Sequence, residues 1–221
     1  MLLAQDDIDP DTPDDHGQTP LYCAARNGYQ RVVELLLGRG DVKPNSPDDD
    51  GQTPFYIAAG NGHEGVVEML LVQYGIDPDA PNNYGQRPLY CAARNDHEGV
   101  VEMLLRRDDI DPNAPDDDGE TPLCCAAECG NKGAVNMLLR RNVVDPNKPD
   151  NHGRTPLLLA IESEYEGVAQ ILLGRDNIDP NKADNKGRTP LLLAACYGNE
   201  ELVQMLLERD DINPGILDMD D

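Results

Sequence analysis

A Thr-Pro dipeptide recurs along this chain at intervals of 34 residues or a multiple of 34. The copies are Thr19-Pro20, Thr53-Pro54, Thr121-Pro122, Thr155-Pro156 and Thr189-Pro190, and Arg87-Pro88 fills the one remaining position. A period of about 20 to 50 residues is the signature of a solenoid, in which each unit contacts only its neighbours. Such a fold has no single core that could enclose an active site, and its long surface favours binding.

The repeat divides most of the 221 residues into six units that stack as one quasi-linear domain. We expect the units at 14–47, 48–81, 82–115, 116–149, 150–183 and 184–217. Residues 1–13 are expected to form a partial leading unit, and residues 218–221 to start a truncated seventh unit. Two explanations fit these ends: the chain is a piece of a longer array, which we favour, or its ends stack on other copies.

Neither terminal unit shows the polar outer face that a capping repeat requires. Several apolar residues of these two units are therefore expected to be internal residues that face water: Leu21, Val32, Val33, Leu202, Val203 and Leu206.

The fourth unit shows how one repeat is built. A turn ending in Gly119 precedes Thr121, which stands where a helix N-cap belongs, and Pro122 stands at the first helical position. A short helix follows and ends at Gly130, and a second helix carries apolar residues at helical spacing from Ala134 onward. The sequence predicts an all-α solenoid of helix-turn-helix units, with helices of about nine residues and with projecting loops or short hairpins.

The pattern Gly-x-Thr-Pro-Leu-x-x-Ala-Ala, followed by Gly-His-x-x-Val-Val-x-x-Leu-Leu, resembles the ankyrin repeat. This resemblance covers nearly the whole chain and recurs six times, with one residue more than the usual 33. The recurring Arg-Asp-Asp-Ile-Asp-Pro-Asn loop further resembles arrays in large fungal intracellular receptor-type proteins. The resemblance implies a module that binds a protein or peptide through a concave groove, without catalysis.

Three positions depart from the pattern. Arg87 replaces the Thr cap, which costs roughly 0.5–2 kcal/mol at a helix start. Asp96 and Glu164 stand where the first helix is usually followed by Gly, at a site that requires positive φ. We therefore expect the third and fifth units to be locally weaker.

The chain carries 42 acidic and 18 basic residues and a net charge of −24. This charge argues against nucleic acid as a partner, because a phosphate backbone needs clustered Lys and Arg. It fits a partner with a basic patch equally as well as it fits simple solubility. The sequence has no apolar run long enough to span a bilayer and no secretory leader, so we expect no membrane contact and an intracellular, cytoplasmic location.

No catalytic constellation, cofactor motif or metal site stands out. His63-Glu64 and His97-Glu98 match half of a zinc-protease motif, but the second His is missing and helix capping is the ordinary role. The cluster Cys124, Cys125 and Cys129 is interpreted as small, buried and apolar. Weak calcium binding by the Asp-rich turns stays open, with solvated turn residues favoured.

In ankyrin arrays the loop tips and the exposed side of the first helix line the groove. Carried over by position, the candidate protein-binding residues are Asp15, His16, Gln18, Arg26, Asp49, Asp50, Gln52, Asn83, Tyr84, Gln86, Arg94, Asp117, Asp118, Glu120, Glu128, Asn151, His152, Arg154, Glu162, Asn185, Lys186, Arg188 and Tyr197. For any one of them taken alone, a solvated surface residue is the favoured interpretation.

The candidate residues change in charge along the array. They are acidic in the fourth unit, whereas Arg154, Lys186 and Arg188, with Lys148 and Lys182, make the last two units basic. Tyr84 is the aromatic residue at a tip and is the candidate hot spot, because interface energy concentrates in Tyr, Trp and Arg. Two other functions remain open: end-to-end self-association, and regulation of a larger multidomain protein.

Overall fold

The computed structural model describes residues 9–213; the rest of the expected leading unit, residues 1–8, and the expected seventh unit, residues 218–221, lie outside the described part of the chain. Within residues 9–213 the chain forms twelve α-helices and no strand, which confirms the predicted all-α class. The helices are α1 (Pro20–Arg26), α2 (Gln30–Leu37), α3 (Pro54–Gly60), α4 (Glu64–Leu71), α5 (Pro88–Arg94), α6 (Glu98–Leu105), α7 (Pro122–Glu128), α8 (Lys132–Leu139), α9 (Pro156–Glu162), α10 (Glu166–Leu173), α11 (Pro190–Cys196) and α12 (Glu200–Leu207).

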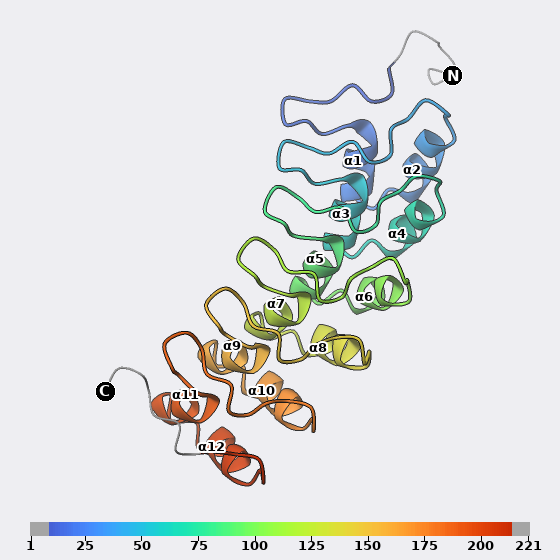
Figure 1. Ribbon diagram of the computed structural model, residues 1–221. Coiled ribbons are helices and arrows are strands. Elements are labelled where there is room, and N and C mark those ends of the chain that lie inside the picture. Colours follow the sequence, from blue (N-terminus) through green and yellow to red (C-terminus); the bar gives the residue numbers. More distant parts are fainter. Residues whose placement is uncertain (1–8, 214–221) are drawn as a thin grey trace.

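The helices pair and stack as a solenoid (Figure 1). The first helices of successive units, α1 to α11 in odd numbers, contact one another in one column, and the second helices, α2 to α12, form a parallel column. Loops that we call fingers project beside the first helices, one per unit, and precede each Thr-Pro position.

The predicted caps are confirmed at five first helices. The side-chain oxygen of each Thr accepts a hydrogen bond from the third helical residue, as Thr121 does from the backbone N–H of Cys124 at 3.1 Å, and Pro occupies the first helical position. Arg87 makes no such bond. The first helices have 7 residues and the second helices 8, so the predicted length of about nine was wrong. Each first helix is confined between its Pro and the following positive-φ residue.

The core is a continuous layer of Ala, Val and Leu between the two columns. It includes Val66, Leu70 and Leu104, and the only Phe of the chain, Phe55. The expectation that apolar residues of the end units face water was wrong for Leu21, Val33, Leu202 and Leu206, which are buried. The helices of each end unit pack on each other and on the adjacent unit, and these contacts cover the four residues, whereas Val32 is 43% exposed as expected.

The fingers are tight hairpin turns joined to one another by backbone hydrogen bonds. In the second finger the N–H of Asp48 donates to the carbonyl of Gln52 at 3.0 Å, and Gly51 turns the chain at φ 79°. The N–H of Asp49 then donates to the carbonyl of His16 in the preceding finger at 3.1 Å, and this link recurs along the array. The predicted projecting hairpins are therefore held as a ladder.

Asp96 and Glu164 adopt the predicted positive φ, at 56° and 60°. Asp96 has a compensating contact, because its carboxylate accepts a hydrogen bond from the N–H of Ala134 in the next unit at 2.7 Å. The lower local stability of the third and fifth units stays a prediction.

A second ladder runs along the loops that follow the second helices. The side chain of Asn113 donates to the carbonyl of Val143 and accepts from the N–H of Asp145, both at 2.7 Å. The same two bonds recur at Asn45, Asn147 and Asn181.

Asp79 interrupts this ladder. A carboxylate cannot donate to a carbonyl as Asn does, and the Oδ1 atom of Asp79 is buried without a hydrogen-bond partner among the described residues. Arg87 donates to the other carboxylate oxygen at 3.2 Å, while its own Nε is also buried and unpaired. Burial raises the pKa of Asp79 to about 6, nearby Asp77 and Asp111 raise it further, and Arg87 opposes the shift.

We expect the free energy of unfolding of the double variant Asp79→Asn/Arg87→Thr to exceed that of the native chain by about 1–3 kcal/mol at pH 7.5. The variant restores one hydrogen bond and one helix cap. Urea unfolding followed by circular dichroism measures this. Because the folded-state pKa of Asp79 exceeds its ordinary value of 3.8, the native chain should gain stability as the pH falls through 6.

The double variant should lack that gain. The mirror substitution Asn147→Asp serves as a control and should destabilise the chain at pH 7.5. A double variant that is no more stable than the native chain would contradict the role given to Asp79.

Candidate protein-binding groove

One side chain from each finger forms an exposed row. These six residues, which we call the finger row, are His16, Asp50, Tyr84, Asp118, His152 and Lys186. Their side chains make no hydrogen bond to other described residues, and Tyr84 is 58% exposed. The backbone ladder fixes the spacing of the row, because the carbonyls of His16, Asp50 and Tyr84 accept bonds from the next finger.

In each finger the residue directly before the finger-row residue is exposed, and three of these residues form hydrogen bonds to the preceding finger. The side chain of Asn83 donates to the carbonyl of Asp49 at 2.9 Å, and that of Asn151 to the carbonyl of Asp117 at 3.1 Å. Asn185 repeats the bond to Asn151 at 3.0 Å. These asparagines hold the fingers together, which their predicted binding role did not anticipate. Asp15 is exposed at the corresponding place in the first finger.

The residues just before the caps are half-buried and face the preceding unit. Tyr22 donates its hydroxyl hydrogen to the side chain of Gln52 at 3.2 Å, and Tyr90 donates to Glu120 at 3.1 Å. Tyr56 makes the same bond to Gln86 at 3.4 Å. Gln18, at the equivalent place in the first finger, accepts a hydrogen bond from the guanidinium group of Arg26 at 3.5 Å.

In the last two fingers arginines replace these Gln and Glu side chains. Arg154 lies 2.6 Å from Asp150, 3.4 Å from Glu120, and 3.7 Å from both Glu128 and Glu162. The Asp150 side chain is 0% exposed.

Arg188 continues the arrangement at 2.6 Å from Glu162, so Glu162 bridges the two units. Arg188 also holds Asp184 at 2.5 Å. Burial alone would raise the pKa of Asp184, but its bonds to Arg188 and to backbone N–H groups outweigh burial and lower it.

Sequence reasoning missed Asp150 and Asp184 as partners. The available signal was an Asp four residues before an Arg, which occurs in these two fingers, whereas Gln or Glu ends the other four.

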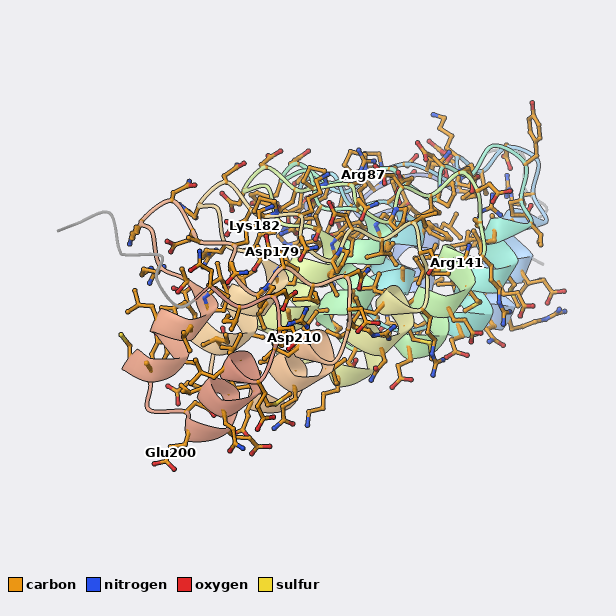
Figure 2. The ribbon with its side chains drawn as sticks, turned by 60° about the horizontal axis from the view of Figure 1, so that its bottom comes forward. Arg87, Arg141, Asp179, Lys182, Glu200 and Asp210 are labelled. Atoms are coloured by element: carbon orange, nitrogen blue, oxygen red, sulfur yellow. The ribbon has the colours of Figure 1, made fainter. Side chains whose placement is uncertain are left out.

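The ion pairs of Arg154 and Arg188 change the interpretation of the last two units, which the sequence predicts to be basic. Arg154 and Arg188 are neutralised by carboxylates of their own groove. Lys148 and Lys182 each donate to a backbone carbonyl of the preceding loop at 2.9 Å, and Figure 2 shows Lys182 on the loop side near Asp179. Lys186 is exposed in the finger row. The side chains that make the end look basic in the sequence therefore mostly join adjacent units.

The remaining candidate residues lie on or directly after the first helices. Arg26, Arg94 and Tyr197 are exposed, whereas Glu128 and Glu162 are half-buried by the arginine network. A hollow of about 340 Å³ lies between the last two fingers, lined by His152, Arg154, Glu162, Asp184, Asn185, Lys186 and Arg188.

Residues predicted to cap the second helices have another role. His63 and His97 make no side-chain cap bond. Their Nε2–H groups donate to the carbonyls of Arg26 at 2.9 Å and Gly60 at 3.1 Å in the preceding unit. The capping interpretation was wrong, because both rings cross to the neighbouring unit.

The cysteine cluster is only partly as predicted. Cys124 and Cys125 are buried, but Cys129 is half-exposed at the end of α7. The thiol of Cys125 donates a hydrogen bond that lowers the pKa of Cys129 to about 7; partial burial opposes the shift and Arg94 supports it. Among residues 9–213 no group of three or more potential metal ligands is found.

The stacked helix pairs and their projecting fingers define a repeat protein of the interaction-scaffold class. The sequence matches the family models described as "Ankyrin repeats (3 copies)" at residues 40–116 and 109–184, and "Ankyrin repeat" at residues 16–49 and 186–219. The chain belongs to the ankyrin-repeat family. Ankyrin repeats are in general protein-interaction modules and are typically non-catalytic.

A comparison with curated proteins gave no match. The likeness of the loops to fungal receptor-type arrays stays a prediction. In the described part of the chain, no helix has the length and apolar character needed to cross a bilayer.

We expect Arg154→Ala to lower the free energy of unfolding by about 2 kcal/mol, because it removes a charged hydrogen-bond partner from the buried Asp150 carboxylate. Lys186→Ala, which removes an exposed cation from the next finger, should change it by less than about 0.5 kcal/mol. Urea unfolding of both variants tests the difference. Equal effects would mean that Arg154 is a surface residue and not part of the fold.

We expect Cys129 to be alkylated by iodoacetamide with a rate that rises through about pH 7, since the thiolate is the reactive form. Burial raises the pKa of Cys124 to about 11, so this thiol should stay unmodified in the native state. Peptide mass spectrometry separates the sites. Cys125→Ala should raise the pH at which the alkylation rate of Cys129 is half-maximal. A value near 9 for the native chain would contradict the lowered pKa of Cys129.

Proposed function

We propose that this chain binds another protein or a peptide through the concave groove, and that the partner presents a basic patch. The finger row supports this most directly. It offers one exposed side chain per unit at a spacing set by the backbone ladder, while the neighbouring side chains are used to hold the fingers together. A surface fixed before binding loses less conformational freedom on association.

Charge supports a basic partner. Asp15, Asp49, Asp50, Asp117 and Asp118 are exposed on the fingers, and the whole chain carries a net charge of −24. Such a field attracts a positively charged partner over about 8 Å at physiological salt and raises the rate of association. The internal neutralisation of Arg154 and Arg188 extends this acidic character toward the last units.

Tyr84 is the proposed hot spot. It is exposed in the third finger, between Asp50 and Asp118 of the adjacent fingers. An aromatic side chain between acidic residues suits a basic segment, because the ring packs on the aliphatic part of Lys or Arg while the carboxylates pair with its charge.

The test is affinity capture from cell extract with three forms of the chain at about 50 and 300 mM salt, read by quantitative mass spectrometry. The groove variant is Tyr84→Ala/Asp50→Asn/Asp118→Asn. The control variant is Tyr74→Ala/Glu68→Gln/Asp108→Asn, which removes an exposed Tyr and two exposed carboxylates outside the groove.

We expect proteins with basic segments to be retained by the native chain and the control variant, and to be lost by the groove variant and at high salt. The same set of proteins on all three forms, or loss from both variants alike, would show that binding does not use the finger row. Affinity for one captured protein should fall at least tenfold with Tyr84→Ala alone.

A further inference from the structure

We propose that a second site, between the C-terminal ends of α2 and α4, binds an arginine side chain of a partner protein. The two helices pack on each other in the second column, on the side of the array away from the fingers (Figure 1). The site lies outside the groove, so this proposal does not rest on the function proposed for the finger row. Four observations at the junction of the first two units support it.

The first observation is a repeat position that changes in one unit. The second residue after the second helix is arginine in five units and Gln73 in the second unit. At two junctions this arginine donates to the carbonyl of the last residue of the preceding second helix. Arg175 donates to the carbonyl of Leu139 at 3.4 Å. Arg209 donates to the carbonyl of Leu173 at 2.9 Å, so a guanidinium group is a ligand that these helix ends accept.

The second observation concerns the equivalent carbonyl in the first unit. Leu37 is the last residue of α2, and its carbonyl accepts no hydrogen bond from any residue between 9 and 213. The last carbonyls of a helix have no partner within the helix and lie at the negative end of its dipole. Neither α2 nor α4 has a basic residue in its last turn. The junction therefore favours a cationic hydrogen-bond donor.

The third observation is a hollow of about 280 Å³ at this junction, which we call the α2–α4 hollow. It is lined by Glu34, Leu37, Gly38, Met69, Val72 and Gln73. The volume suits one side chain better than a drug-sized ligand. Val72 is 77% exposed, and Leu37 and Met69 are half-buried, so the hollow offers an apolar wall for the methylene stem of an arginine.

The fourth observation is charge. The carboxylate of Glu34 lines the α2–α4 hollow, and its ion pair with Arg31 at 2.5 Å is exposed on both sides. An exposed pair of this kind contributes little stability, so Glu34 remains able to pair with another cation. Val72 occupies the position at which the third and fourth units carry Arg106 and Arg140. The second unit thus lacks two arginines that the next two units have at the end of the second helix.

Arginine is the occupant that these observations select. Its planar guanidinium group carries five donors, so one N–H can bond the Leu37 carbonyl while another bonds the Glu34 carboxylate. The ammonium group of lysine is a compact charge that matches this arrangement less well. The net charge of −24 attracts a basic partner to the whole chain, and the α2–α4 hollow gives one of its side chains a defined position.

The probe is Nα-acetyl-arginine methylamide, and the matched control compound is Nα-acetyl-citrulline methylamide, whose side chain has the same length but no charge. Each is titrated into the whole chain, and the methyl signals of isotope-labelled methionines are followed by NMR. We expect the Met69 signal to shift saturably with the arginine probe, at a Kd in the millimolar range, because the ligand is small. The signals of Met103 and Met137, on α6 and α8, should not move.

The citrulline compound should bind at least about fivefold more weakly, because hydrogen bonds to charged groups are the stronger ones. Gln73→Arg supplies the chain's own arginine and should weaken the arginine probe about tenfold or more. This variant should fold, because five other units carry arginine at this position. Gln204→Arg makes the same change at an exposed position of α12 and should leave the Kd unchanged.

Glu34→Gln should weaken the arginine probe about fivefold and leave the citrulline compound unaffected. Equal binding of the two compounds would overturn the proposal. Equal weakening by Gln73→Arg and Gln204→Arg would do the same, because the probe would then follow only the net charge of the chain. Nα-acetyl-lysine methylamide that binds as tightly as the arginine probe would overturn the assignment to arginine. None of these measurements involves the finger row, so the proposal for the groove stands or falls separately.

Discussion

Contact between neighbouring units is the interaction on which this structure depends. Helices of 7 and 8 residues are too short to be stable alone in water, and each survives because apolar residues such as Val66 and Leu70 are covered by the units on either side. The same contact explains why the array is elongated, because each added unit extends the core in one direction only. It also explains why the surface is long and open.

Polar side chains serve this contact as much as apolar ones do. The Asn ladder, the fingers, the histidines on the preceding carbonyls and the Arg154 network all cross from one unit to the next. A side chain used in this way is held in place and has less capacity left for a partner. The proposed binding is therefore assigned to the finger row, where one side chain per unit remains exposed on a backbone held by the ladder.

The break at Asp79 follows from the same principle. Where one residue of a ladder changes, a buried oxygen loses its donor, and the nearby Arg87 compensates only in part. The unit-to-unit contact thus sets the local stability of each unit.

The sequence by itself determined the all-α class and the caps of five first helices, because Thr19-Pro20 and its repeats act locally through the first turn of each of these helices. It likewise predicted positive φ at Asp96 and Glu164. Only the tertiary structure decided which charged residues remain available, since Arg154 and Asp150 neutralise each other, and Glu162 joins adjacent units, through distances that no single repeat contains. It also decided that Leu21 and Leu206 are buried, because the helices of each end unit pack on each other and on the adjacent unit.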